Sequence, residues 1–267
     1  MIICPKCKNK NEDDSFFCDE CGTKLETLGG KAVFVDGHEE EIPYGKETVR
    51  AEEYKDRMDL VSIILPDSVT SIEEGAFSGC MLLGYANIPS RVTSIGRCVF
   101  YGCTSLTDIT LSDSVTEIGE WAFAGCASLE SISLPDSVTT IGKCAFSDCV
   151  LLAYVTLPSG ITSIGEYAFS GCSALREIEI PESIEVLENC VFYNCSLLAE
   201  IFVPYGVREI KTFAFAGCTS VAEIIIPETV ERIGEYAFTG CPSLAVSYSG
   251  TRGRWREIYP ADDVEIN

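Results

Sequence analysis

The chain has 267 residues, a formal net charge of −22, 15 cysteines and a single histidine. This acidity disfavours nucleic acid and anionic membranes as main partners, because both repel a negatively charged surface. The single histidine excludes most catalytic designs that depend on an imidazole base, and the hydrophobic content of 46% excludes a disordered chain. No apolar run approaches the ~18 residues that a membrane-spanning helix requires.

Two Cys-x-x-Cys pairs open the chain, Cys4 with Cys7 and Cys18 with Cys21. Each pair can present two thiolates from one tight turn, and four thiolates complete a tetrahedral Zn²⁺ site with no open position for catalysis. A redox pair and an iron site of rubredoxin type are the alternatives. The stretch from Cys4 to Leu25 resembles the short zinc-ribbon modules at the N-termini of many bacterial proteins. We therefore expect a ribbon domain over residues 1–27 that binds one structural zinc ion, which would supply its folding energy.

The chain opens with residues 1–7, a polar and charged stretch follows at once, and nothing between Lys8 and Asp14 could serve as the apolar core of a secretion signal. We therefore expect the protein to stay in the cytoplasm with reduced thiols and without disulfides. Residues 28–41 are expected to form a linker and a hairpin around the Asp36-Gly37 turn, which would cover the open end of the following domain. His38 lies beside three glutamates, where a solvated loop and a weak second metal site are both open possibilities.

The rest of the chain is built on one repeated motif, Ala-Phe-x-Gly-Cys. In two of the eight copies the alanine is replaced by valine, and the closing cysteines fall at intervals of 23 residues without insertion or deletion. They are Cys80, Cys103, Cys126, Cys149, Cys172, Cys195, Cys218 and Cys241. A fixed period of this length predicts a solenoid, in which each unit stacks on its neighbour in register.

One unit shows the expected local structure. The alternation at the end of Leu106–Leu111 predicts a short strand, and most units have a proline after it, where a strand must end. Residues 115–119 predict a second short extended piece. Residues 120–126 are too short for a full helix and predict a helical turn or a 3₁₀ segment.

This pattern resembles the leucine-rich repeat of the BspA type over about Leu60 to Leu244. The resemblance rests on the phenylalanine and cysteine columns and on the leucine column Leu106, Leu129, Leu152, Leu175 and Leu198. It implies a right-handed superhelix with a concave parallel β-sheet and short 3₁₀ or helical turns on the convex side. It also implies a binding surface, and some members of this family are cell-surface adhesins that bind host matrix proteins.

The ends of the array are expected to be capped. The solenoid should span residues 42–248 and begin with a degenerate unit at residues 43–65, in which Tyr54 takes the place of the phenylalanine and Arg57 that of the cysteine. Residues 249–267 should form a C-terminal cap. There Trp255 and Ile258 are three residues apart and can dock a helical turn on the last unit.

Three further cysteines alternate with larger residues two positions before the phenylalanine column. Cys98, Cys144 and Cys190 alternate with Trp121, Tyr167 and Phe213. Steric packing of large against small residues explains the alternation, and a set of reactive thiols is the sharper hypothesis. The column of eight cysteines is likewise expected to serve packing rather than metal binding.

The outward positions of the predicted sheet supply a candidate surface for a protein partner. Its C-terminal part combines acidic residues with exposed apolar ones, a mixture that suits an interface with a protein or peptide, possibly a basic one. A merely solvated strand face is the alternative. The candidate residues are Tyr85, Tyr154, Glu177, Glu179, Glu200, Phe202, Glu223 and Ile225.

The sequence predicts a non-enzymatic protein–protein interaction module. It contains no glycine-rich phosphate loop and no paired histidine and cysteine, and the repeat leaves no long insertion to host a catalytic site. Four ribbon lysines are balanced by carboxylates, which argues against nucleic-acid binding by the ribbon. The alternatives are an adhesin exported to the cell surface by a non-standard route and an uncharacterised enzyme.

Overall fold

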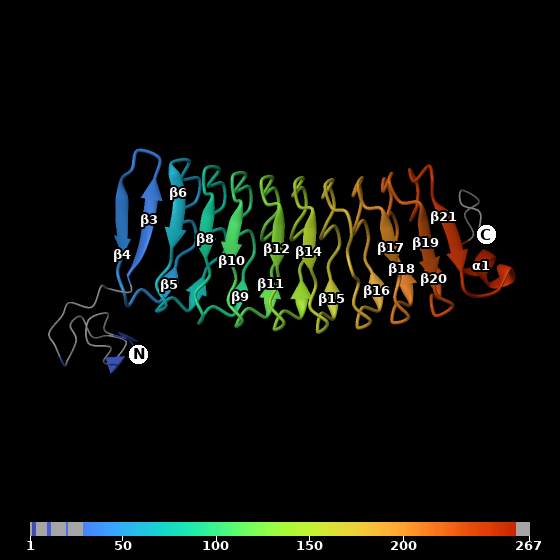
Figure 1. Cartoon of the computed structure of the whole chain (residues 1–267), viewed down its shortest axis with the longest axis horizontal. Helices are drawn as coiled ribbons and strands as arrows, with labels where there is room; N and C mark the ends of the chain where they lie inside the picture. Colours follow the sequence, from blue (N-terminus) through green and yellow to red (C-terminus); the bar gives the residue numbers. More distant parts are fainter. Residues whose placement is uncertain (1, 4–9, 12–19, 21–28, 260–267) are drawn as a thin grey trace.

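The protein is an elongated β-solenoid in which successive 23-residue units lie side by side along one axis (Figure 1). This structure is a computed structural model that describes residues 2–3, 10–11, 20 and 29–259. The four cysteines of the predicted zinc site lie outside the described residues. Of the segment before residue 29, the structure describes β1 (Ile2–Ile3) and β2 (Lys10–Asn11), which pair in antiparallel fashion.

Each unit contributes short strands to two parallel ladders. The first ladder forms what we call the strand face, and it consists of β6 (Leu60–Ile64), β8 (Tyr85–Asn87), β10 (Asp108–Thr110), β12 (Ser131–Ser133), β14 (Tyr154–Thr156), β17 (Glu200–Phe202), β19 (Glu223–Ile226) and β21 (Ala245–Tyr248). The second ladder consists of β5 (Thr48–Val49), β7 (Ser71–Ile72), β9 (Ser94–Ile95), β11 (Glu117–Ile118), β13 (Thr140–Ile141), β15 (Ser163–Ile164), β16 (Val186–Leu187), β18 (Glu209–Ile210) and β20 (Arg232–Ile233). Both predicted extended pieces thus form strands in every unit except the one in which residues 177–180 form none, and the predicted parallel solenoid is confirmed.

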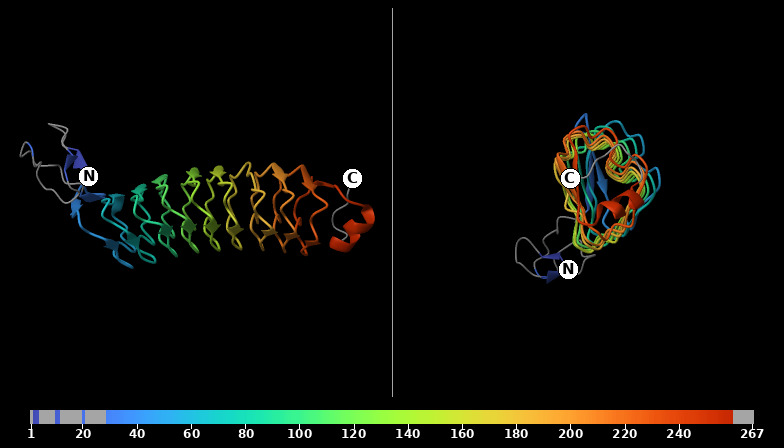
Figure 2. Two further views of the ribbon diagram at one scale, coloured as in Figure 1. Left: turned by 90° about the horizontal axis from the view of Figure 1, so that it is seen from below. Right: turned by 90° about the vertical axis from the view of Figure 1, so that its right-hand side faces the viewer.

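The register of the ladders follows the sequence period. Asp108 pairs with Tyr85 and Glu223 pairs with Glu200, so equivalent residues of successive units lie next to each other. When the solenoid is viewed from its end, the successive units superpose and share one outline (Figure 2). Every column of the sequence is therefore a row of neighbouring side chains in space, which is how the repeat builds both its core and its surface.

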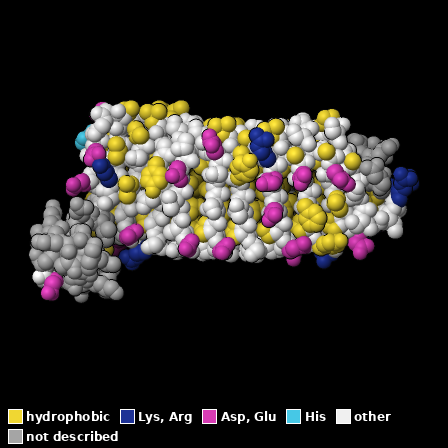
Figure 3. Space-filling view, in the orientation of Figure 1, with side chains coloured by type: hydrophobic (Ala, Val, Ile, Leu, Met, Phe, Trp, Pro, Cys, Tyr) yellow, Lys and Arg dark blue, Asp and Glu magenta, His cyan; other side chains and the backbone are white. Residues whose placement is uncertain are grey.

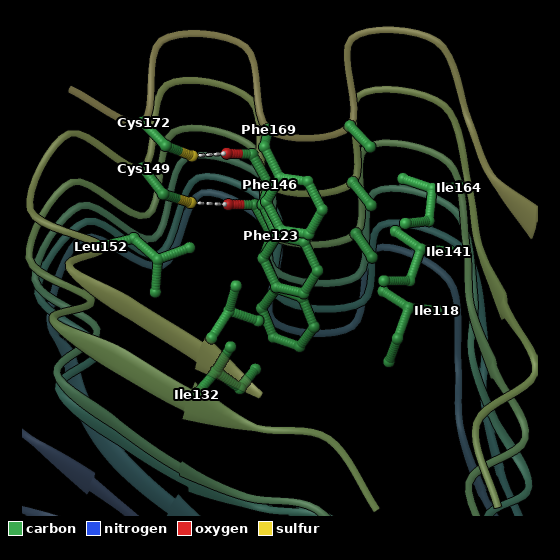
Figure 4. Packing of buried hydrophobic residues seen from close by; sticks show 14 of the residues in the cluster. Ile118, Phe123, Ile132, Ile141, Phe146, Cys149, Leu152, Ile164, Phe169 and Cys172 are labelled. Carbon is green, nitrogen blue, oxygen red and sulfur yellow. Dashed lines mark hydrogen bonds between the residues drawn. The ribbon is translucent and has the colours of Figure 1, made fainter. Parts of the chain in front are cut away.

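The core is a stack of aromatic rings. Eight phenylalanines from Phe77 to Phe238 lie 5.3–6.0 Å apart between ring centroids, with interplanar angles of 4–15°. Tyr54 of the degenerate first unit continues the stack at 5.4 Å from Phe77. The rings are buried between the leucine and isoleucine columns of the two ladders (Figure 4). Offset stacking of this kind adds to the free energy gained by burying each ring.

The cysteine column ties each unit to the preceding one. The Sγ–H group of Cys149 donates a hydrogen bond to the carbonyl of Phe123, and that of Cys172 donates to the carbonyl of Phe146 (Figure 4). The same bond recurs along the column over 2.8–3.2 Å. Burial raises the pKa of Cys80 and of Cys149 to about 12, so these thiols remain protonated donors at neutral pH.

The predicted helical turns on the convex side are absent from the described solenoid. Residues 96–103 form successive turns whose hydrogen bonds run three residues back, such as Tyr101 N–H to Cys98 carbonyl. Cys98 and Gly102 have φ of 53° and 70°, in the left-handed region, and equivalent positions of other units do too. A 3₁₀ segment needs negative φ throughout, so the left-handed residues convert the expected helix into turns.

Both ends of the stack are closed. The hairpin of β3 (Gly30–Phe34) and β4 (Glu39–Ile42) pairs with β6 in antiparallel fashion, and Arg57 lies 4.4 Å from the ring of Phe34. At the other end α1 (Arg252–Ile258), capped by Thr251, is the one helix among the described residues. Its Trp255 and Ile258 are buried, as the sequence predicts. No helix in the described part of the chain is long and apolar enough to cross a membrane.

Candidate functional site: an acidic groove on the strand face

A groove of about 990 Å³ lies on the strand face in the C-terminal half of the solenoid. It extends across four consecutive units, and the buried side chains of Ile178 and Ile201 belong to its lining. Figure 3 shows acidic side chains around hydrophobic ones on the part of the molecule that carries β17 and β19. The groove is therefore a depression on the described surface whose lining is both acidic and apolar.

Seven of the eight residues predicted as the partner surface line this groove. They are Tyr154, Glu177, Glu179, Glu200, Phe202, Glu223 and Ile225. All seven are exposed, with Tyr154 at 53%, Phe202 at 56% and Ile225 at 43%. The eighth, Tyr85, is only partly exposed on β8 and does not line the groove. The structure thus brings the predicted residues together, whereas their role in binding stays a prediction.

The hollow itself was not predicted from the sequence. Its lining includes the small residues Ala199, Ser220 and Ala222, and the two alanines lie just before the outward Glu200 and Glu223. Equivalent positions of other units hold both small and large residues, Gly84, Glu130, Ala153 and Arg176 among them. This column therefore carries no signal from which the depression could have been predicted.

The sheet is interrupted beneath the groove. Residues 177–180 form no strand, so that the first ladder is divided between β14 and β17. Glu177, Glu200 and Glu223 occupy the same column, and Glu200 and Glu223 are direct register partners. Like charges directly opposite each other destabilise strand pairing. The acidic column therefore costs stability in the paired strands β17 and β19, next to the break in the ladder.

The carboxylates of the groove lack basic partners. Within the described part of the chain, none of its four glutamates forms an ion pair, and no lysine or arginine lines the groove. Glu223 accepts a hydrogen bond of 3.0 Å from the Ser247 hydroxyl. The groove is thus an acidic surface whose charge the described residues leave uncompensated.

Elsewhere the basic residues are used between neighbouring units. Lys143 pairs with Glu166 at 2.9 Å, and Lys211 pairs with Glu188 at 2.8 Å, in each case across 23 residues of sequence. Arg232 and Glu209 repeat the arrangement at 3.0 Å. These pairs lie beside the second ladder. Three ion pairs thus join neighbouring units beside the second ladder, whereas no ion pair among the described residues reaches the four glutamates of the groove.

The other candidate residues are placed away from the groove. Burial raises the pKa of the Cys98 and Cys144 thiols, which lowers their reactivity and favours the packing explanation of this column. The eleven described cysteines are free. His38 is exposed, and its ring stacks on Phe34 at 5.7 Å. No group of three or more potential metal ligands occurs among the described residues.

Comparison with solved structures supports the architecture. A leucine-rich repeat protein from T. pallidum is 30% identical, and the alignment covers 77% of this chain and 85% of that one with a TM-score of 0.53. A leucine-rich repeat protein from Eubacterium ventriosum is 20% identical, with coverage of 82% and 69% and a TM-score of 0.53, and shows the same fold. Among curated proteins no match was found.

The family model described as a BspA type leucine rich repeat region matches residues 47–151 and 117–245. These two overlapping matches cover the described solenoid from β5, the first strand of the second ladder, to the beginning of β21. The groove lies within them. Together with the 23-residue register, the phenylalanine stack and the similarity to the T. pallidum protein, they establish that this chain belongs to the BspA-type leucine-rich repeat family.

Proposed function

We propose that the protein is a non-enzymatic recognition module whose groove binds a basic and partly apolar segment of another protein. The observation that carries the proposal is the set of four unpaired glutamates around the exposed side chains of Tyr154, Phe202 and Ile225. Exposed aromatic and aliphatic side chains provide the apolar contact area of interfaces, and the surrounding charge selects the partner. The non-enzymatic part rests on the repeat, whose 23-residue period continues through residues 47–245 without an insertion that could host a catalytic site.

Charge complementarity identifies the class of partner. The groove adds like charges in one column to a chain that already carries −22. A ligand with lysine or arginine side chains would relieve this repulsion and would be steered toward the groove at long range. An acidic or purely apolar ligand would leave the carboxylates uncompensated and is therefore disfavoured.

A peptide-display selection on the full chain tests the proposal. Wild-type protein should enrich sequences that combine lysine or arginine with apolar residues, and the triple variant Glu177→Lys, Glu179→Lys and Glu200→Lys should lose them. The matched control reverses three exposed carboxylates outside the groove, Asp108, Glu117 and Glu130, and should retain the selected peptides. If both variants enrich the same peptides as the wild type, the groove is not the binding site.

We further propose that residues 1–27 form a zinc ribbon in which Cys4, Cys7, Cys18 and Cys21 bind one structural Zn²⁺ ion. The spacing of the two cysteine pairs and the chemistry of four thiolates support this assignment. The ribbon would serve as a structural or docking element beside the solenoid. Metal analysis of purified protein is the test, and much less than one zinc per chain would refute it.

We propose a cytoplasmic location with reduced cysteines. The free thiols of the cysteine column support it, because each Sγ–H donates to a phenylalanine carbonyl and oxidation would remove that donor. Cell fractionation tests the location. Recovery of the protein at the surface of intact cells would instead favour an exported adhesin, a role also known among relatives of this repeat type.

A further inference from the structure

We infer that the segment bound by the groove is a basic amphipathic α-helix that lies along the long axis of the solenoid. This inference rests on the proposed function and adds the shape of the ligand to its charge. Two parallel rows of side chains run across the units of the groove. The first row is Glu177, Glu200 and Glu223, and the second is Glu179, Phe202 and Ile225.

The two rows call for a ligand with two matching stripes. Residues of the two rows are two positions apart on each unit, so their side chains point to the same face about 6.8 Å apart. The first row is acidic throughout, whereas the second ends in the exposed Phe202 and Ile225. A helix with a basic stripe next to an apolar stripe presents both to one surface at the same time.

The spacing along the groove matches the helical repeat. Neighbouring strands of a parallel ladder lie about 4.8 Å apart, so the three glutamates of successive units span about 9.6 Å on the strand face. Residues at positions i, i+3 or i+4, and i+7 of an α-helix lie on one face and span about 10.5 Å. Three cations on one helix face therefore have nearly the same spacing as the three carboxylates.

An extended peptide fits this spacing less well. Its side chains on one face recur about every 6.8 Å, so three of them span about 13.6 Å and drift out of register with the glutamates by about 4 Å, most of one unit. Strand addition is also disfavoured, because residues 177–180 lie between β14 and β17 where the ladder is broken and so occupy the place that an added strand would take (Figure 1). The rows thus select a helix over a strand.

The length of the groove sets the length of the helix. The groove runs from Tyr154 to Ile225 over four units, which is three steps of the stack. Three turns of helix, about eleven residues and 16 Å, span these steps. Tyr154 stands at one end, where its exposed ring can take a further cation by a cation–π contact.

Three fluorescent peptides of identical composition test the inference. One carries lysines at i, i+4, i+7 and i+11 next to an apolar stripe and is held helical by a covalent staple. The second carries the same residues, is stapled likewise, and distributes its lysines around the helix. The third alternates lysine with apolar residues and favours an extended chain. Fluorescence anisotropy measures their affinities for the full-length protein and for E177Q/E200Q/E223Q, whose fold is checked by circular dichroism.

The inference predicts that the first peptide binds the wild type at least about tenfold more tightly than the other two, and that the triple variant loses this preference. If the alternating or the scrambled peptide binds as tightly and the triple variant weakens it, the helix inference is overturned while groove recognition stands. If the triple variant binds every peptide as the wild type does, or no peptide binds, the proposed function fails as well.

Discussion

Removing one ring from the middle of the phenylalanine stack should destabilise the whole solenoid. Phe146 is fully buried and lies 5.3 Å from Phe123 and 5.4 Å from Phe169, with interplanar angles of 4° in both cases. Phe146→Ala loses the buried ring, leaves a cavity and breaks both stacked pairs. We expect a loss of about 3–5 kcal/mol in the free energy of unfolding.

A second substitution at the same site separates stacking from burial. Phe146→Leu keeps an apolar side chain but removes both aromatic pairs, each worth about 0.5–1.5 kcal/mol, so we expect a loss of about 1–3 kcal/mol. Urea unfolding followed by circular dichroism gives the free energies, and Leu151→Ala, at a side chain 49% exposed, is the control. If Phe146→Ala lowered the free energy of unfolding no more than the control does, the stack would not be the core of the fold.

Four other outcomes follow from the packing of one unit on the next. Gly142→Ala should cost about 1–3 kcal/mol in urea unfolding, because a Cβ there would lie 2.7 Å from the Glu120 nitrogen, whereas Gly84→Ala, with 3.7 Å to its nearest neighbour, should cost much less. Cys149→Ala should cost about 1 kcal/mol, since it removes the Sγ–H bond to the Phe123 carbonyl and leaves that carbonyl with the Cys126 N–H as its donor, and an unchanged urea midpoint would contradict a contribution of the thiol bond. In native protein at about pH 8, iodoacetamide should leave Cys80 and Cys149 unmodified until the chain unfolds; mass spectrometry that finds them promptly alkylated would refute their burial. Because the pKa of these two thiols is raised in the folded protein, only the unfolded chain ionises them readily above about pH 9. The stability that they contribute is therefore retained below about pH 9 and lost as the pH rises toward about 12. An unfolding midpoint that stays constant over this range would contradict this expectation.

The repeat made the architecture predictable because each column of the sequence becomes one row of contacts. The cysteine interval fixed the register, and the buried phenylalanine stack follows from it. The degenerate first unit was recognisable because Tyr54 falls at the phenylalanine position and indeed stacks on Phe77. The docking of Trp255 and Ile258 likewise followed from their spacing of three residues.

The turns on the convex side were predicted wrongly, for a physical reason. Left-handed backbone is usually signalled by glycine, yet the column that begins with Gly75 holds Cys98 and Trp121 in the next two units, with φ of 53° and 57°. The neighbouring unit imposes the positive φ at these positions, through hydrogen bonds such as the one that the Trp121 N–H donates to the Lys143 carbonyl. Single-residue preferences therefore pointed to a 3₁₀ turn that the neighbouring unit overrides.

The candidate site was predictable in its residues but not in its form. Alternation identified the outward glutamates and the exposed Phe202, because a strand turns every second side chain to one face. The hollow is lined by residues of four units, among them Ala199, Ala222 and residues 177–180, so it forms between units rather than within one. The ion pairs of the basic residues join neighbouring units and leave the glutamates of the groove unpaired. These pairs became visible only in the stacked structure.

The central claim is that the acidic groove recognises a basic segment, and the salt dependence of peptide affinity tests it most directly. The stapled basic peptide is titrated against wild-type protein and against E177Q/E200Q/E223Q at about 50 mM and about 300 mM NaCl, where screening lengths differ about 2.5-fold. We predict that wild-type affinity falls about tenfold or more at the higher salt and that the triple variant binds weakly and almost independently of salt. Equal affinity and equal salt dependence of the two proteins would contradict the account.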